Sequence, residues 1–461
     1  MKSYKKILSV LLASSMVLTL AACGNKTENK EAEKTENTEM TETTAGDFTG
    51  KTLTLAGLDG GYGTEGWKAV IAGFEKKTGA KVEARFEKNI YDVIRPEIQA
   101  GNAPDVIYNS LGQETALTET MIKENMIMDI SDVFNGKVLG EENIVKDKIL
   151  DGALETSVTN PYGDGKQYLA PLFYSPNGLW YNQAMFKDGG GKYDLPKTFD
   201  DMVKLGETAK ADGVALWTYP TAGYFDSFMF ALINEVGGPE LFNKLTNYDA
   251  EAWKNEATPL FENVAKLLPY LHKNTVAQAN NESFTKNQLS VMTNESLFMP
   301  NGTWIVNEMK DAQGVAEGFK WGFMPLPALT EGGDRYAFSY LEEVFVSKDA
   351  KEPELAKAFI SYLYSDEAVK AFADNGAFQP VKGVDQYITD ENNKLFYSVY
   401  KDGAKAAMGT FAAAPAVEGV SIADALFQAV DSVANGDKTV QDWQAGVVDA
   451  AQKLADAIKA Q

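Results

Sequence analysis

The chain has 461 residues and carries 65 Asp and Glu against 43 Lys and Arg, so its formal net charge is −22 at pH 7. This acidity argues against a nucleic-acid partner, because binding to a phosphate backbone requires basic surface. One cysteine and one histidine exclude an intrachain disulfide, a cysteine-rich metal site and a multi-histidine zinc site.

The chain begins as a secretory signal does. Three lysines precede an apolar run at 7–20, which is shorter than the about 20 residues of a membrane-spanning helix. The small residues directly before Cys23 resemble the bacterial lipobox, where cleavage leaves a lipid-modified cysteine as the new first residue. We therefore predict a lipoprotein signal peptide at 1–22 and lipidation of Cys23, which attaches the chain to the extracellular face of the cell membrane. The alternative is an ordinary signal peptide with an incidental thiol.

A polar segment follows the predicted lipid anchor. Gly24–Gly46 consists largely of Asn, Lys, Thr and Glu, with Met40 as the only large apolar side chain. Such a segment buries too little apolar surface to offset its ordering entropy, so we predict a disordered tether at 23–49. About 415 residues remain after the tether, and this length suits two or three domains.

The first part of the body alternates strand and helix patterns. The expected elements are a strand at 51–55, a glycine-rich loop at 57–66, a helix at 67–77 ended by Gly79, a strand at 81–86, a helix at 90–100 and a strand at 104–108. This order predicts parallel βαβ units and an α/β fold.

The later part of the chain is mainly helical. We expect a strand-like stretch at 167–171 leading into 179–182, helices through most of 199–309, a strand at 338–347, and helices at 353–364, 366–374, 421–434 and 439–460.

The glycines of the first loop also match a dinucleotide fingerprint. Gly61, Gly63 and Gly66 have the required spacing, but Ala56–Gly60 separates the strand from the first of them. In that fingerprint the first glycine follows the strand closely, so we reject the match and expect no cofactor.

Five short segments resemble extracellular solute-binding proteins of the maltose-binding-protein type. They occur in the order of that family, within a resemblance that runs from about Lys51 to the C-terminus. The segments are 74–82, 101–107, 301–304, 353–359 and 433–440.

The resemblance implies a two-lobed, periplasmic-binding-protein-like α/β fold whose chain crosses between lobes three times. By position, the crossings fall near 170–174, 340–342 and 378–380. The resemblance also implies a monomeric receptor, not an enzyme, that delivers a solute to the transmembrane permease subunits of an ATP-binding-cassette importer. The predicted lobes are 50–169 with 342–378, and 172–340 with 380–461.

A sugar site needs flat aromatic side chains for the ring faces and Asp, Glu, Asn or Gln for the hydroxyl groups at the ring edge. The resemblance implies that Tyr62 lies in the first ligand loop, that Tyr224 and Trp304 stack on sugar rings, and that Asn109 takes the place of an aromatic ligand residue. That last departure puts maltodextrin specificity in doubt. The other residues with suitable chemistry near these positions or near the crossings are Ser175, Tyr219, Asp226, Asn301, Tyr340 and Glu342.

These patterns predict a receptor for a mono- or oligosaccharide. The segment 169–186 resembles subfamilies that handle amino sugars or chito-oligosaccharides, and this resemblance implies an amino sugar as one option. An exported glycoside hydrolase that uses two carboxylates is the first alternative, because 65 acidic residues supply many candidates. A receptor for a non-sugar ligand is the second. A Ser-His-Asp site would have to use His272, which we expect to be an isolated surface histidine.

Overall fold

The computed structural model describes residues 47–60, 62–110, 117–156, 158–221, 224–280, 284–412 and 414–460. The predicted signal peptide, Cys23 and the tether up to residue 46 lie outside the described residues. Within the described ranges, no helix is both long enough and apolar enough to span a bilayer.

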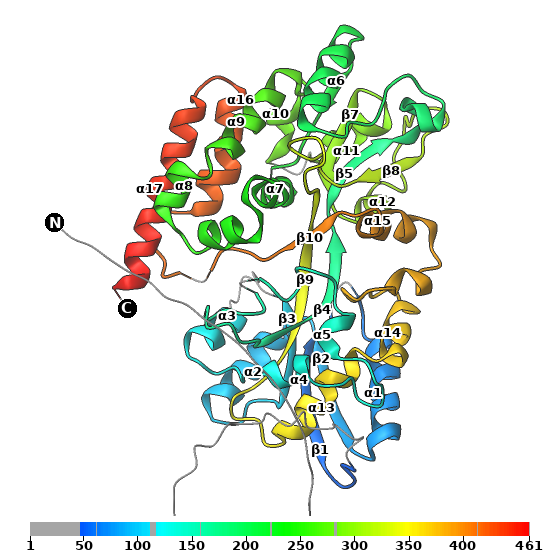
Figure 1. Cartoon of the computed structure of the whole chain (residues 1–461), viewed down its shortest axis with the longest axis vertical. Coiled ribbons are helices and arrows are strands. Elements are labelled where there is room, and N and C mark those ends of the chain that lie inside the picture. The colour runs from blue at the N-terminus through cyan, green and yellow to red at the C-terminus, as the bar shows by residue number, and fades with distance from the viewer. Residues whose placement is uncertain are drawn as a thin grey trace, which may run out of the picture. The chain divides into compact units, whose positions relative to one another are not determined.

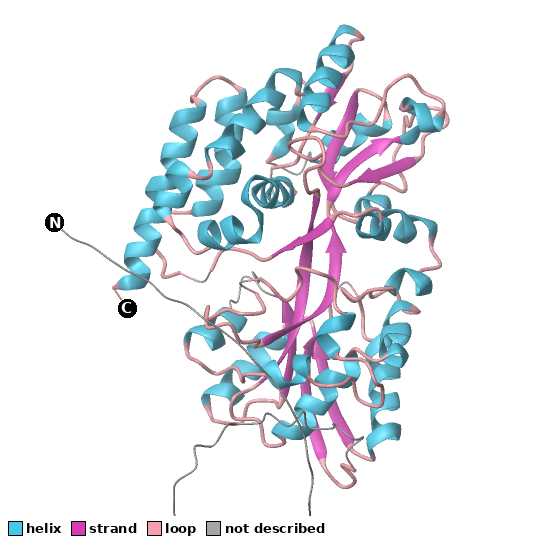
Figure 2. Ribbon diagram, in the orientation of Figure 1, coloured by secondary structure: helices cyan, strands magenta, loops and turns pink. Residues whose placement is uncertain are grey.

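Two β-sheets organise the body (Figures 1 and 2). The larger has the order β10-β9-β3-β1-β2, with β4 also paired to β9, and the smaller has the order β6-β7-β5-β8. The strands of the larger sheet are β1 (Thr52–Leu58), β2 (Lys81–Glu87), β3 (Val106–Ser110), β4 (Leu169–Pro176), β9 (Tyr336–Val346) and β10 (Lys405–Met408). Those of the smaller sheet are β5 (Gly178–Asn182), β6 (Ala215–Trp217), β7 (Ser296–Asn301) and β8 (Trp321–Met324).

The helices fall into two groups along the chain. Those in the part that contains β1 to β3 and the end of β9 are α1 (Glu65–Thr78), α2 (Ile90–Gln99), α3 (Leu117–Lys123), α4 (Ser131–Asn135), α5 (Val145–Lys148), α13 (Pro353–Leu363) and α14 (Asp366–Ala373). The others are α6 (Phe199–Ala211), α7 (Phe225–Thr246), α8 (Ala250–Asn255), α9 (Thr258–Leu267), α10 (Thr275–Ala279), α11 (Phe284–Met292), α12 (Ile305–Glu308), α15 (Glu391–Lys401), α16 (Ala429–Ala434) and α17 (Val440–Lys459). Helices α8, α9, α16 and α17 pack side by side (Figure 1).

The predicted βαβ order is confirmed. Strand β1 pairs in parallel with both β2 and β3. Helix α1 buries Trp67, Val70 and Phe74 against the sheet and ends at Gly79, whose φ of 73° is in the left-handed region that glycine adopts readily. The positions of these elements thus follow from local sequence patterns.

Two long strands connect the two sheets. Strand β9 pairs with β10 at its beginning and with β3 at its end, while β4 runs antiparallel along it (Figure 2). Strand β4 then leads directly into β5 of the smaller sheet. The fold is therefore the predicted two-lobed α/β type, and the predicted first and second crossings fall within β4 and β9. The exact lobe boundaries remain a prediction.

Two details differ from the expected boundaries. Phe48, expected in the tether, packs against the core, and its N–H donates to the carbonyl of Thr78 at 3.0 Å. Beyond the expected third crossing, the N–H of Lys382 donates to the carbonyl of Lys148 at 2.7 Å, and the short helix Val384–Tyr387 packs on α14. Helix α15 contacts both this short helix and β8, so the position of the third crossing remains a prediction.

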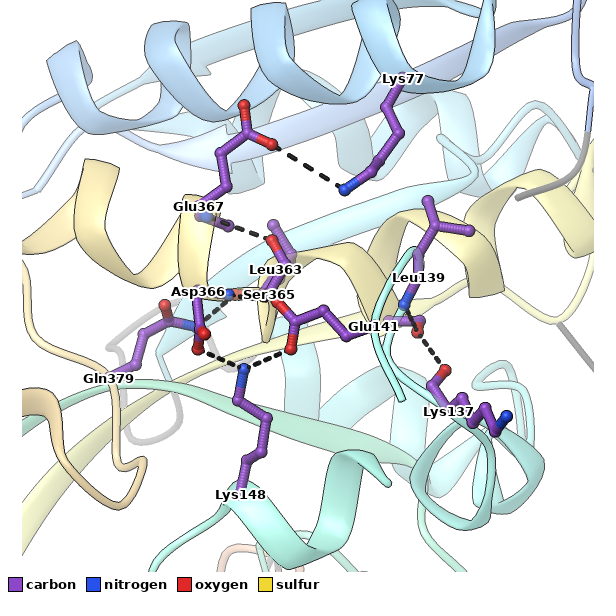
Figure 3. Close-up of polar contacts among 12 residues, drawn as sticks. Lys77, Lys137, Leu139, Glu141, Lys148, Leu363, Ser365, Asp366, Glu367 and Gln379 are labelled. Carbon is purple, nitrogen blue, oxygen red and sulfur yellow. Dashed lines mark hydrogen bonds and ion pairs between the residues drawn. The ribbon is translucent and has the colours of Figure 1, made fainter. Parts of the chain in front are cut away.

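A polar cluster stabilises the region around α5 and α14 (Figure 3). The Lys148 ammonium lies 2.8 Å from carboxylate oxygens of both Glu141 and Asp366, and Glu141 also accepts the Asp366 N–H at 2.6 Å. The side chains of Lys148 and Glu141 are only 12% and 18% exposed. Because both charges are largely removed from water, loss of one leaves the other without compensation.

We therefore expect Lys148→Met to lower the free energy of unfolding by about 3 kcal/mol. Lys394→Met is the matched control, because the Lys394–Glu391 ion pair is on the surface and such pairs contribute about 1 kcal/mol or less. Urea denaturation of both variants measures the difference. Equal losses in the two variants would contradict the stabilising role of the cluster.

Candidate functional site

The segment after β7 places Trp304 beside other aromatic rings. The buried Asn301 side chain accepts the N–H of Gly302 at 2.7 Å, and the Asn301 carbonyl accepts the Trp180 indole N–H at 3.0 Å. The Trp304 ring lies directly over Gly302, since a Cβ at that position would be 2.2 Å from the ring. Only a glycine at 302 leaves room for this orientation.

Three aromatic rings gather around this turn. The Trp304 ring centroid is 5.6 Å from that of Tyr224 and 5.8 Å from that of Tyr340, with interplanar angles of 34° and 42°. Tyr224 directly precedes α7, and Tyr340 belongs to β9. All three side chains are partly exposed. We call Trp304, Tyr224 and Tyr340 the aromatic triad.

Two carboxylates lie beside the aromatic triad. The Tyr340 hydroxyl donates to Asp226 at 2.7 Å, and the Tyr224 hydroxyl donates to Glu308 at 3.1 Å. Burial raises the pKa of the Asp226 carboxyl, and the hydrogen bond from Tyr340 partly opposes this shift. The triad thus combines apolar ring faces with hydrogen-bonding groups at their edges.

A second polar group lies where β3, β4 and β9 meet. The Tyr108 hydroxyl donates to Glu342, and Tyr62 packs on Phe173 with ring centroids 5.0 Å apart. Burial raises the pKa of Glu342 to about 7, although the hydrogen bond from Tyr108 opposes the shift. The pKa of Tyr62 is raised mainly by burial and further by Glu342. We call Tyr62, Tyr108 and Glu342 the crossing group.

One hydrogen bond connects the segments that carry the two groups. The hydroxyls of Ser175, in β4, and Thr303, next to Trp304, are 2.7 Å apart. The chain positions of these residues differ by 128, so only the tertiary fold brings them together. The predicted residues Tyr62, Ser175, Tyr224, Asp226, Trp304, Tyr340 and Glu342 therefore belong to connected parts of the structure.

Three predicted contacts are placed differently. Asn109 is 1% exposed and donates to the Thr118 hydroxyl at 2.5 Å, so its amide has a structural partner. Tyr219 is fully buried against Trp217 and Phe225, and its hydroxyl donates to Asp431 at 2.9 Å. The Asn301 side chain is fully buried in the turn before Trp304. None of these three offers surface to a ligand in this structure.

Sequence reasoning missed three members of the site. Glu308 accepts from Tyr224, Tyr108 donates to Glu342, and Thr303 bonds to Ser175. Glu308 lies one helical turn after Trp304, a spacing that places two residues on one side of a helix. That spacing was the available signal for Glu308, whereas the partners of Tyr108 and Thr303 are distant in sequence.

The histidine expectation is wrong. His272 is 9% exposed rather than on the surface, and its Nε2 lies 3.3 Å from Glu295. Burial lowers its pKa, and Glu295 opposes that shift. In the part of the chain that the structure describes, no group of three or more His, Cys, Asp or Glu side chains could hold a metal ion.

The order of strands in the two sheets, the strands β4 and β9 that connect them and the aromatic triad beside these strands define a periplasmic-binding-protein-like fold. Residues 60–370 match the family model of bacterial extracellular solute-binding proteins. The chain therefore belongs to the bacterial extracellular solute-binding protein family, whose members are substrate-binding proteins.

Several proteins that are similar to this chain carry names that refer to sugars or solutes. The diacetylchitobiose binding protein NgcE of Streptomyces coelicolor is 26% identical over 337 residues, which cover 70% of this chain and 68% of that protein. The maltodextrin-binding protein MdxE of Bacillus subtilis is 24% identical over 413 residues, which cover 86% of each. The solved structure of the bacterial solute receptor AcbH matches with a TM-score of 0.69 at 18% identity, covering 88% of this chain and 99% of that one.

Proposed function

We propose that this chain is the membrane-anchored receptor of an ATP-binding-cassette importer and that it binds a mono- or oligosaccharide. The lipid on Cys23 anchors it to the extracellular face of the membrane, and the permease subunits of the importer are its protein partners. The receptor acts as a monomer and does not alter the sugar.

The aromatic triad is the observation that carries this proposal. Three partly exposed rings gather at one place, with the Trp304 ring within 5.8 Å of each of the others, and each tyrosine of the triad is bonded to a carboxylate. Sugar rings present C–H faces that pack on aromatic rings and hydroxyls that bond to carboxylates. The names of NgcE and MdxE support an oligosaccharide, and the former supports an amino sugar as one candidate.

Preferential binding of the sugar to a closed form of the receptor would inform the importer that the sugar is bound. Strand β9 carries Tyr340 of the triad and also Glu342, which lies at the second predicted crossing. A ligand that touches both lobes only when they are closed shifts the population toward that form. A tenfold preference for the closed form supplies about 1.4 kcal/mol of bias.

Calorimetric titration of the protein with diacetylchitobiose and maltotriose tests the proposal, with chromatography of the mixture after incubation. We expect one equivalent of at least one saccharide to bind and no shorter product to appear. Turnover would establish the alternative of a glycoside hydrolase. A lack of binding across a wider panel of saccharides, together with binding of an amine or a peptide, would establish a non-sugar receptor.

Glu342 should make the stability depend on pH. Its pKa in the folded protein, about 7, is above the ordinary value of 4.5, so between these values the folded state binds more protons than the unfolded state. The free energy of unfolding should therefore fall as pH rises from 4.5 to 7, by on the order of 3 kcal/mol from this residue.

Glu342→Gln should remove this contribution, because the amide does not titrate. Urea denaturation at pH 5 and at pH 8 measures the slope for the wild type, for Glu342→Gln and for the exposed-site control Glu354→Gln. The control should keep the slope of the wild type. If Glu342→Gln kept it as well, the burial of the Glu342 carboxyl would not be the cause.

A further inference from the structure

Asp431 is a buried carboxylate that lies far from the triad in the chain, yet it is bonded to the segment just before Tyr224. It belongs to α16 and is 9% exposed. Its Oδ1 accepts the Tyr219 hydroxyl at 2.9 Å, and both of its oxygens lie 3.3 Å from the Thr221 hydroxyl. Oδ2 also accepts the side-chain amide of Asn280. One side chain thus collects donors from two separate segments.

The bonds of Asp431 act on both sides of Tyr224. On one side, Thr221 lies three residues before Tyr224 in the chain. On the other side, the Tyr219 ring packs on that of Phe225, the residue directly after Tyr224, with ring centroids 4.9 Å apart. Because Tyr219 and Thr221 share one acceptor, loss of that acceptor releases both flanks of Tyr224.

Burial makes this arrangement specific. A buried carboxylate is unfavourable unless hydrogen-bond donors compensate for the lost water, and a buried donor without an acceptor is unfavourable in turn. Burial raises the pKa of the Asp431 carboxyl, and the hydrogen bonds from Tyr219, Thr221 and Asn280 oppose this shift. The carboxylate and its donors therefore stabilise one another only while the segment stays in place.

We propose that Asp431 is a positioning residue for the carbohydrate site, which holds Tyr224 in the aromatic triad without contacting the sugar. The inference rests on the proposed function, because it treats Tyr224 as part of the sugar platform. The ring centroids of Tyr224 and Trp304 are 5.6 Å apart. Without Asp431 both rings are still present, but Tyr224 is no longer held at this distance.

Two substitutions at 431 separate the acceptor from the volume of the side chain. Asp431→Leu has a similar volume and no acceptor. Asp431→Asn keeps one oxygen for Tyr219 and Thr221, and its amide can donate to Asn280 once the Asn280 amide turns over. We expect Asp431→Leu to weaken saccharide binding about tenfold, the value of about one aromatic contact, and Asp431→Asn to remain within about threefold of the wild type. Calorimetric titration measures both, at a temperature where circular dichroism shows the variants to be folded.

Asp212→Leu is the matched control. Asp212 follows α6 and accepts the Tyr193 hydroxyl at 2.8 Å, so this variant also removes the acceptor of a tyrosine, but outside the triad. We expect it to leave saccharide affinity within about twofold of the wild type, since distant sites act independently.

A double-mutant cycle shows whether Asp431 acts through Tyr224. If Asp431 only positions that ring, Asp431→Leu should weaken binding no further in Tyr224→Ala, where the ring is already absent. A residue that acts independently of Tyr224 would weaken binding by the same factor in both backgrounds. Loss of the effect in Tyr224→Ala is therefore a result that a merely structural role does not produce.

Hydrogen exchange followed by mass spectrometry gives a readout that needs no saccharide. Amides exchange through local opening, so we expect faster exchange in peptides covering 218–228 for Asp431→Leu, and unchanged exchange in α6. Asp431→Asn should exchange as the wild type does. If the wild type bound no saccharide, the carbohydrate proposal would fail, and the exchange result would still show separately whether Asp431 holds this segment.

A second variant replaces Asp431→Leu should that protein fail to fold. Tyr219→Phe combined with Thr221→Val removes the two donors of the segment and leaves Asp431 bonded to Asn280. The same loss of affinity is expected, and the same absence of loss in Tyr224→Ala. Wild-type affinity in the folded variant, an equal loss with and without the Tyr224 ring, an equal loss in Asp431→Asn, or unchanged exchange over 218–228 would each overturn the inference.

Discussion

Trp304→Ala should weaken saccharide binding about 70-fold. The indole face is the largest of the triad, and a stacked sugar that covers roughly half of the about 200 Å² which such a side chain can bury makes about 100 Å² of apolar contact. At about 25 cal/mol per Å² the loss is about 2.5 kcal/mol, which corresponds to this factor. Calorimetric titration with whichever saccharide binds the wild type measures the change directly.

Trp321→Ala is the matched control for this prediction. Trp321 is also a partly exposed tryptophan, but it lies in β8, outside the triad. Its ring packs on those of Trp180 and Phe319. We expect it to lower stability while leaving the affinity within about twofold, on the general rule that distant sites act independently. If Trp304→Ala bound as tightly as this control, the triad would not be the sugar platform.

The orientation of Trp304 can be tested without removing the ring. In Gly302→Ala the new methyl carbon would lie 2.2 Å from the indole, so the ring has to move. Affinity should then fall although Trp304 is still present.

Cys23→Ser should release the protein from the cell. If Cys23 carries the lipid, the wild type sediments with membranes and the variant, which lacks the thiol that is acylated, appears in the medium. Incorporation of labelled palmitate into the wild type, and none into the variant, provides a second measurement. Stable anchoring requires more than one acyl chain, so partial acylation would give a mixed distribution.

The variant should bind saccharide as the wild type does, since every residue of the proposed site lies at or after Tyr62 in the chain. An unchanged distribution between cells and medium, with no palmitate in either protein, would establish the alternative of an ordinary signal peptide with an incidental thiol.

Local patterns were enough to predict much of this fold. The alternation of polar and apolar residues and the glycine at 79 predicted the β1-α1-β2 unit, because strand pairing and helix ends depend on neighbouring residues. The order of five short segments indicated the family, which the match over residues 60–370 confirms. The acidic balance argued against nucleic-acid binding, and the single histidine excluded a multi-histidine zinc site, because both depend on composition alone.

Only the tertiary structure decided which aromatic side chains remain accessible. Tyr219 and Tyr224 lie five residues apart in one aromatic segment. Tyr219 is fully buried and its hydroxyl donates to Asp431, whereas Tyr224 is partly exposed and lies beside Trp304. The local sequence cannot predict which of the two tyrosines is buried, because burial depends on partners that are distant in the chain, such as Asp431, 212 residues away from Tyr219. The sequence by itself therefore determined the kind of fold and the kind of side chains, while long-range packing decided which of them can contact a ligand.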